Sequence, residues 1–314
     1  MALTQSNTFA TMRGPRRRAA AGRKKAERIL LKDERMKKRQ SRSTVPDRHA
    51  LYEVAVQGVD WDLDFLERSW CRGHPGREPR TFREDFCSTA ALAVAWAQRG
   101  PRRRSWAVDL DPEPLRWARK CRLPFVREAA RRVTLVRSDV RRAQKQKVDV
   151  ACALNFSWWV FHQRRDLLAY LRAARAGLMP GGVLVLNAFG GTRAECKLIE
   201  RTRKGPSNAP DGTALPGFTY IWEHAHLNAL DRQLVAYIHF ELRDGRRLRR
   251  AFTYDWRMWT LPELREAALE AGFSEFEVWA EGWDAHRRTH TGTLHRRVQL
   301  DQEDSWVAYA VCRR

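Results

Sequence analysis

Strand-like and helix-like segments alternate along the first half of the chain. A short segment ends at Phe86 and Cys87 and leads into the Ala-rich run 89–98, which is stopped by a Gly-Pro pair. A second apolar run, Trp106 to Val108, follows and ends on Asp109. This order is strand, turn, helix, strand, which predicts an α/β domain with a parallel sheet.

The same alternation continues downstream. Asp111 can cap a helix whose first residue is Pro112, where the missing N–H costs nothing. The run 148–154 is apolar except for Asp149, as expected for a parallel strand buried on both faces. The further predicted elements are a helix to about residue 119, strands at 133–136, 148–154 and 183–189, and a helix at 164–178.

The rest of the domain is predicted from similar signals. Apolar residues at helical spacing cover 47–70, with Gly58 as a break. Three alternating runs predict an antiparallel β-meander, inserted after the fifth strand within residues 190–260. The polar segment 193–217 is expected to be a mobile lid. The remaining predicted elements are the meander strands 218–226, 233–242 and 246–256, a helix at 261–272, and an antiparallel pair at 276–283 and 306–311.

Charge separates a tail from this domain. The chain carries a net charge of +22, and residues 1–48 hold 15 basic against four acidic residues. We expect residues 1–46 to form a basic tail, largely disordered or helical, and 47–314 to form the domain. Both parts are basic, which favours RNA or a ribonucleoprotein as partner. The alternative is a solubilising tail.

Metal, disulfide and membrane signals are weak. The six cysteines show no Cys-x-x-Cys pair, which favours a reducing compartment and no structural zinc. The loop 284–304 carries three His, but its Arg density favours solvent or phosphate contacts over a metal site. No apolar run is long enough to cross a membrane. We expect a protein of the cytoplasm or mitochondrial matrix that is not secreted, and the acid-poor start also resembles a transit peptide.

Residues 84–90 and Asp109 resemble the class I S-adenosylmethionine-dependent methyltransferases. The family's first motif, Asp/Glu-x-Gly-x-Gly-x-Gly, lies on Glu84-Asp85-Phe86-Cys87-Ser88-Thr89-Ala90, and its second acidic motif lies on Asp109. An uncharacterised bacterial-type branch, in which the turn reads Glu-Asp-Phe-Cys-Gly-Thr, is more similar still. The resemblance implies a Rossmann-like seven-stranded methyltransferase sheet with S-adenosyl-L-methionine as cofactor.

The resemblance also implies roles for individual residues. Glu84 positions the methionine end of the cofactor, the turn from Cys87 to Ala90 passes beneath it, and Asp109 binds the ribose hydroxyls. Leu110 belongs to the same set. Further along the chain, Asp139 accepts a hydrogen bond from the adenine amino group and Val140 lies beside the ring. The segment 178–182, Leu-Met-Pro-Gly-Gly, is a further landmark of this class.

One feature departs from the family pattern. The three glycine positions of the first motif hold Phe86, Ser88 and Ala90. A left-handed conformation at Ser88 would cost about 1–2 kcal/mol and weaken cofactor binding several-fold to tenfold or more.

The fourth strand delivers Asn155 to the carboxyl edge of the sheet, where ligands bind in such folds. Asn155 with Trp158 resembles the Asn-Pro-Pro-Tyr arrangement of amino-methylating enzymes, without its prolines. The resemblance implies that Asn155 orients the acceptor and contacts the cofactor, while Trp158 packs on substrate. An aromatic lid over the cofactor is the alternative. His224 and Tyr254 of the meander are further candidates for proton handling.

These features favour an S-adenosylmethionine-dependent methyltransferase that acts on RNA or a ribonucleoprotein. Two alternatives stay open. One is a catalytically inactive, methyltransferase-like scaffold for RNA binding or ribosome assembly. The other is a small-molecule N-methyltransferase, which the inserted meander resembles. A nicotinamide-binding domain is disfavoured, because no Gly-x-Gly-x-x-Gly sequence is present.

Overall fold

The computed structural model describes residues 45–314, except 143–144, 285–288 and 302. The chain divides into two units, residues 1–46 and 47–314. The predicted basic tail therefore lies almost wholly outside the described residues, and the elements of the fold belong to the second unit.

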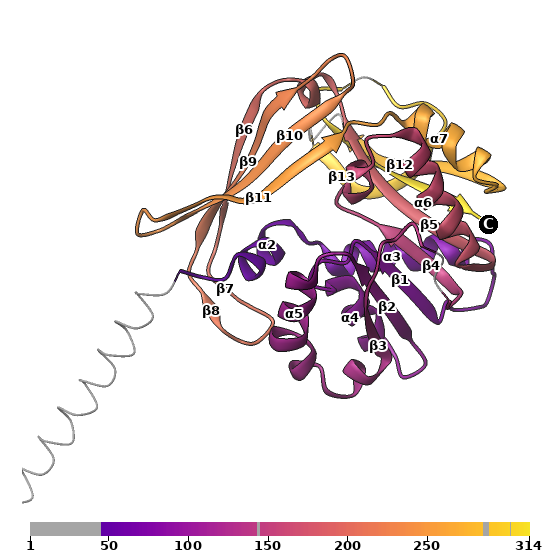
Figure 1. The fold of residues 1–314 in the computed structure, drawn as a ribbon, viewed down its shortest axis with the longest axis horizontal. Coiled ribbons are helices and arrows are strands. Elements are labelled where there is room, and N and C mark those ends of the chain that lie inside the picture. Colours follow the sequence, from indigo (N-terminus) through magenta and orange to yellow (C-terminus); the bar gives the residue numbers. More distant parts are fainter. Residues whose placement is uncertain (1–44, 143–144, 285–288, 302) are drawn as a thin grey trace, which may run out of the picture. The chain divides into compact units, whose positions relative to one another are not determined.

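The second unit is built on an eight-stranded sheet (Figure 1). Five neighbouring strands are parallel, and the three at one edge are antiparallel. In spatial order the strands are β13 (Thr289–Arg297), β12 (Glu275–Asp284), β14 (Trp306–Arg313), β5 (Leu178–Gly190), β4 (Val148–Ala153), β1 (Thr81–Asp85), β2 (Arg104–Asp109) and β3 (Val133–Arg137).

The predicted Rossmann-like fold is confirmed, but the predicted strand count of seven was wrong. The eighth strand, β13, lies in the segment 284–304, which was expected to be a loop. β13 pairs only with β12 at the edge of the sheet. Its sequence contains a single large apolar residue, Leu294, so no alternation of apolar residues marks it as a strand.

Helices cover both faces of the sheet. Side chains of α3 (Val59–Cys71), α4 (Ala91–Gln98) and α5 (Pro112–Cys121) pack on one face. Those of α6 (Arg164–Ala176) and α7 (Leu261–Glu270) pack on the other. Successive residues of a strand serve opposite faces, which explains why parallel strands such as β4 are apolar throughout.

Between β5 and α7 the chain forms a second sheet, which we call the roof sheet. Its order is β11 (Arg247–Arg257), β10 (Gln233–Leu242), β9 (Phe218–Leu227) and β6 (Leu198–Lys204). Every second residue of β10 is buried. Leu51 and Tyr52 of α2 (Arg48–Val56) pack against this side of the roof sheet.

The three predicted meander strands are present, and the segment 193–217, which was expected to be a mobile lid, contains regular structure. That segment forms β6 and a two-stranded ribbon, β7 (Ser207–Asn208) with β8 (Ala214–Leu215). Five of the seven residues of β6 are exposed and four are charged, so the strand has no apolar pattern. The short 3₁₀ helices are η1 (Leu123–Phe125), η2 (Arg127–Arg132), η3 (Ser157–Val160) and η4 (Thr192–Glu195).

Candidate functional site

The turn after β1 carries unusual backbone strain. Phe86, Ser88 and Ala90 have φ values of 56°, 47° and 57°. These are the three positions at which the sequence motif calls for glycine. A left-handed conformation costs a residue with a side chain about 1–2 kcal/mol. Such strain persists only where the surrounding structure imposes it, and it is typical of functional sites.

Hydrogen bonds that involve β1, β2 and α4 hold the turn in this conformation. The Ser88 N–H donates to Asp109 Oδ2 at 2.7 Å, and the Cys87 N–H donates to the Val108 carbonyl at 3.0 Å. Ala90 stands at the N-cap of α4 but has no side chain that could cap it. Glu84 does so instead, because its Oε2 accepts the Ala93 N–H at 2.8 Å.

Glu84 is a buried carboxyl group, 6 % exposed. Burial raises its pKa to about 8, against smaller opposing effects from the amides of Ala93 and Leu92 and from the Arg122 charge. Near neutral pH the group is therefore on the border of ionisation. A cation placed next to it would favour the carboxylate.

A second strained turn follows β4. Asn155 and Phe156 have φ values of 53° and 59°. The Phe156 N–H donates to Asn187 Oδ1 at 3.0 Å, and the Trp158 indole N–H donates to the Asn187 carbonyl at 2.8 Å. Asn187 of β5, which is 5 % exposed, thus holds this segment in place.

The two turns enclose a cavity of about 190 Å³, which we call the edge cavity. The strand order reverses between β1 and β4, and this switch point is where open α/β sheets bind ligands. The residues that line the edge cavity include 84–88 at the end of β1 and beyond it, Leu154 and Asn155 after β4, Tyr52 and Gln57 in and after α2, and Phe252, Tyr254 and Trp256 of β11. Of the predicted site residues it contains Glu84, Phe86, Cys87, Ser88, Asn155 and Tyr254.

The other predicted cofactor residues do not line the edge cavity. Ala90 is fully buried beneath the turn, and Val140 is 6 % exposed. Asp109 accepts the Ser88 N–H and, through Oδ1, the Asp111 N–H at 2.9 Å. The Leu110 N–H also bonds this carboxylate. A carboxylate accepts about four hydrogen bonds, so Asp109 can still accept one from a ribose hydroxyl. Leu110 is 64 % exposed and can lie against a ligand.

Asp139 is engaged differently from Asp109. Its two carboxylate oxygens accept hydrogen bonds from the Arg141 guanidinium at 2.7–3.1 Å, and Arg141 also reaches Asp166 at 2.8 Å. Hydrogen bonding from Arg141 lowers the pKa of Asp139. The carboxylate is thus already paired, which leaves less of it for an adenine amino group.

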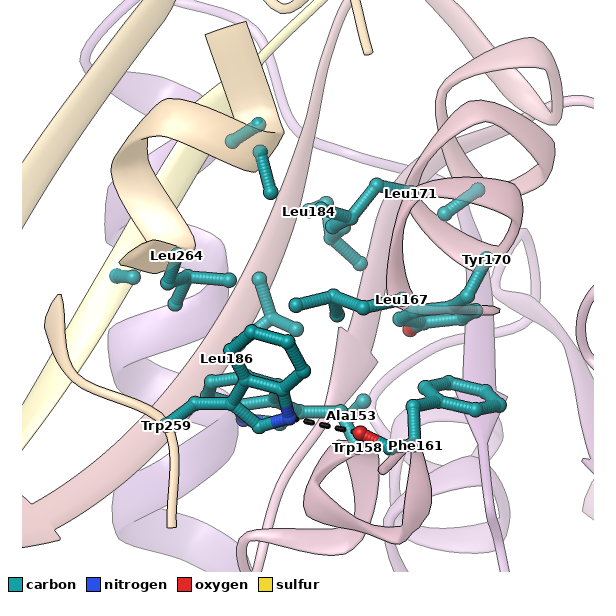
Figure 2. Close-up of a cluster of buried hydrophobic side chains, with 14 of the residues drawn as sticks. Ala153, Trp158, Phe161, Leu167, Tyr170, Leu171, Leu184, Leu186, Trp259 and Leu264 are labelled. Atoms are coloured by element: carbon teal, nitrogen blue, oxygen red, sulfur yellow. Dashed lines mark hydrogen bonds between the residues drawn. The ribbon is translucent and has the colours of Figure 1, made fainter. Parts of the chain in front are cut away.

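Trp158 lies away from the edge cavity. It is fully buried in the core between the sheet and α6, together with Phe161, Leu167 and Trp259 (Figure 2). Its position follows from η3, which turns the indole inward onto Asn187. Trp158 is therefore not part of the site that we propose.

The two residues considered for proton handling differ in position. Burial raises the pKa of Tyr254 well above its usual value, so this phenol stays protonated near neutral pH, and its hydroxyl donates a hydrogen bond to Tyr52. His224 is 4 % exposed and lines a separate cavity of about 200 Å³, the roof cavity. Burial lowers its pKa. Within the described residues neither ring nitrogen makes a hydrogen bond of normal geometry.

The structure also reveals a cavity that sequence reasoning missed. This α3 cavity, of about 500 Å³, lies next to Asp62 of α3 and Tyr309 of β14. It shares Asn155 with the edge cavity, and Ser305 and Val307 with the roof cavity. One sequence signal pointed to it. Asp62 stands between Val59 and Leu66 on the apolar side of its helix, where a carboxylate is out of place.

Neither a metal nor a membrane signal is found in the part of the chain that the structure describes. No three His, Cys, Asp or Glu side chains there are grouped as metal ligands. His286 of the His-rich segment lies outside the described residues, and His295 belongs to β13. No helix among the described residues has the length and apolar character needed to span a bilayer.

Comparison with known proteins gave no match to a protein-family model and none to a curated protein sequence. Solved structures do match. A methyltransferase from Clostridium acetobutylicum, described as S-adenosylmethionine-dependent, is 16 % identical with a TM-score of 0.59, over 84 % of this chain and 96 % of that chain.

Two further matches are described as sugar-modifying enzymes. CalS10, an amino pentose methyltransferase from Micromonospora echinaspora, is 18 % identical with a TM-score of 0.57, over 85 % and 97 % of the two chains. The sugar N-methyltransferase KedS8 from a Streptoalloteichus species is 14 % identical with a TM-score of 0.53, over 98 % of each chain. Together with the strand order, these likenesses show that residues 47–314 have the fold of the class I S-adenosylmethionine-dependent methyltransferases.

Proposed function

We propose that this protein is an S-adenosylmethionine-dependent methyltransferase whose acceptor is a small molecule. The observation that carries the proposal is the edge cavity at the switch point of the sheet, with five left-handed non-glycine residues in the two turns beside it. Strain concentrated at one ligand-binding edge is typical of a functional site.

The residues at this edge fit the cofactor. One of its ribose hydroxyls would be held by Asp109, whose oxygens retain a free lone pair, and its adenine ring would lie against exposed Leu110. The ammonium group of its methionine end would favour the ionised form of Glu84. Ser88 and Ala90 occupy glycine positions but already adopt the required left-handed backbone.

When bound, the cofactor supplies an activated methyl group, so the protein needs no nucleophile or metal of its own. The residues of this chain would align the acceptor and exclude water. Asn155, which lines both the edge cavity and the α3 cavity, is our choice for orienting the acceptor. The Tyr254 hydroxyl, which donates to Tyr52, lines the roof sheet side of the edge cavity, where its oxygen can accept a hydrogen bond.

A small acceptor is favoured over RNA. Three aromatic residues of β11 form the roof sheet's side of the edge cavity, whose volume of about 190 Å³ suits a small molecule better than a polymer. Two of the structural matches are described as sugar methyltransferases. The expectation of RNA rested on the positive charge of both parts of the chain. The basic tail lies outside the described residues, and none of the three structural matches above is described as an RNA methyltransferase.

Calorimetry of S-adenosylmethionine binding to the full chain tests this proposal. We expect micromolar affinity, and a loss of about 10- to 100-fold in Asp109→Ala, because hydrogen bonds to a charged group contribute about 1.5–3 kcal/mol. Asp139→Ala is the matched control and should lose less, since its carboxylate is already paired with Arg141. Absence of binding at millimolar cofactor would reject the methyltransferase and favour a non-catalytic scaffold.

A further inference from the structure

The α3 cavity lies beside the proposed cofactor site and shares a lining residue with it. Asn155 lines both this cavity and the edge cavity. A molecule bound in the α3 cavity could therefore meet a methyl group presented at Asn155. Its volume of about 500 Å³ is within the range of small-molecule sites.

The charge of this cavity is opposite to that of the protein. The chain carries 59 Lys and Arg against 37 Asp and Glu. Yet the described residues that line the α3 cavity include Asp62, Glu281 and Glu303 and no Lys, Arg or His. In so basic a chain, this lining makes the cavity a place where a cation is attracted and an anion is repelled.

Asp62 is the most constrained of these carboxylates. Its helix presents it on the apolar side, next to Leu63 and Leu66, and Tyr309 donates a hydrogen bond to its Oδ1 at 3.1 Å. Burial raises the pKa of Asp62 to about 6, despite that hydrogen bond. Among the described residues Tyr309 is its one hydrogen-bond donor, and a buried carboxylate with a single neutral donor gains much from a cationic partner.

Aromatic side chains form much of the remaining wall. Trp61, Trp306 and Tyr309 line the cavity. Trp61 is fixed by a hydrogen bond from its indole N–H to the Gly292 carbonyl at 3.2 Å. Trp306 lies so close over Gly190 that a Cβ there would meet its ring at 2.1 Å. Fixed aromatic rings beside a carboxylate suit an organic cation, because ring faces attract positive charge.

We propose that the α3 cavity binds the acceptor of methyl transfer as a protonated amine, and that Asp62 is the residue that holds its ammonium group. Before its nitrogen can accept a methyl group, the ammonium gives up one proton, which the Asp62 carboxylate accepts and later releases to water. This inference rests on the proposed function, because it places the amine beside a cofactor that the fold accommodates. It adds a substrate class, organic amines, and a binding residue to that function.

The test compares amines with neutral molecules of the same shape. Benzylamine and cyclohexylamine, with benzyl alcohol and cyclohexanol as partners, are titrated into the full chain at pH 8, where Asp62 is ionised. Binding is followed by the indole NMR signals of Trp61 and Trp306. We expect each amine to bind at least about tenfold more tightly than its alcohol.

Two variants decide whether Asp62 is responsible. Asp62→Asn should abolish the preference for amines while leaving the affinity for S-adenosylmethionine within about twofold. Asp64→Asn removes the same charge from the outer face of α3, where Asp64 pairs with Arg99, and should keep the preference. Because Asn can accept the Tyr309 hydrogen bond, Asp62→Asn should fold, which circular dichroism checks.

The outcomes separate this inference from the proposed function. Equal binding of amines and alcohols, or an amine preference that survives in Asp62→Asn, would overturn the inference even if the cofactor binds. An Asp62-dependent amine preference without cofactor binding would uphold the cavity as an amine site and reject the methyltransferase.

Discussion

The edge cavity and the α3 cavity meet at Asn155 but are built in different ways. The edge cavity is shaped mainly by backbone, since left-handed residues after β1 and β4 curve the chain around it. The α3 cavity is shaped by side chains of α3, β12 and β14, with unstrained backbone at Asp62 and Tyr309. A site shaped by the backbone suits a ligand that many proteins share. A site shaped by side chains can change its ligand specificity through single substitutions.

Removing the ionisable group of Glu84, in the edge cavity, is expected to change the free energy of unfolding more than any other substitution proposed here. Folding raises its pKa from 4.5 to about 8, so the folded state favours the protonated form. Stability should therefore fall as the pH rises from about 4.5 to 8. Glu84→Gln keeps an oxygen for the Ala93 N–H but cannot ionise. Between pH 5 and pH 8, wild type should lose on the order of 3–5 kcal/mol more than this variant in chemical denaturation.

Glu128→Gln is the control for that measurement, because the Glu128 side chain is 76 % exposed. Its pH dependence should match that of wild type. If the unfolding free energy of Glu84→Gln depends on pH as that of wild type does, then the edge cavity does not disfavour the ionised form of Glu84.

Substitutions of Asn155 test whether its side chain contributes to ligand binding in both cavities. Asn155→Gly and Asn155→Ala both remove the amide, but only Gly adopts φ 53° without strain. Both variants should bind S-adenosylmethionine and benzylamine about 3- to 10-fold more weakly, the worth of one hydrogen bond. Only Asn155→Ala should also lose about 1 kcal/mol of unfolding free energy. Full affinity in Asn155→Gly would mean that the amide has no part in either cavity.

Ser88→Gly should change stability and cofactor affinity the least, and it should increase both. Relief of the left-handed strain should raise the unfolding free energy by about 0.5–1 kcal/mol and tighten cofactor binding several-fold. Ala95→Gly lies one turn into α4, in ordinary helical backbone, and should lower stability by about the same amount. A loss of stability in both variants would show that Ser88 makes side-chain contacts worth more than its strain.

The sequence predicts the strands that are buried on both faces, because burial demands an unbroken apolar run. β4 is the clearest case, and its one polar residue, Asp149, caps the start of β1 by accepting from the Thr81 N–H at 2.9 Å. β13 and β6 escape prediction for the converse reason. Their side chains are mostly polar and they stand at sheet edges, so no periodicity distinguishes them from loops.

The candidate site likewise contains features that the sequence predicts and features that it does not. The turn around Ser88 could be located because a motif constrains backbone positions in consecutive residues. The direction of Trp158 could not, because it depends on Asn187 of a neighbouring strand. The pairing of Asp62 with Tyr309 joins residues 247 positions apart, which no local pattern encodes. How α3 meets β14 is a property of the assembled fold.

The two hydrogen bonds that Asp109 receives from Ser88 and Asp111 have a thermodynamic consequence. They fix the carboxylate in one rotamer before any ligand arrives, so little side-chain entropy is left to be lost on binding. Binding at this end should therefore resemble docking onto a rigid template. A cofactor analogue that lacks one ribose hydroxyl would then lose the full binding enthalpy of that hydrogen bond. The Asp109 carboxylate would gain little side-chain entropy in return, because its rotamer is already fixed.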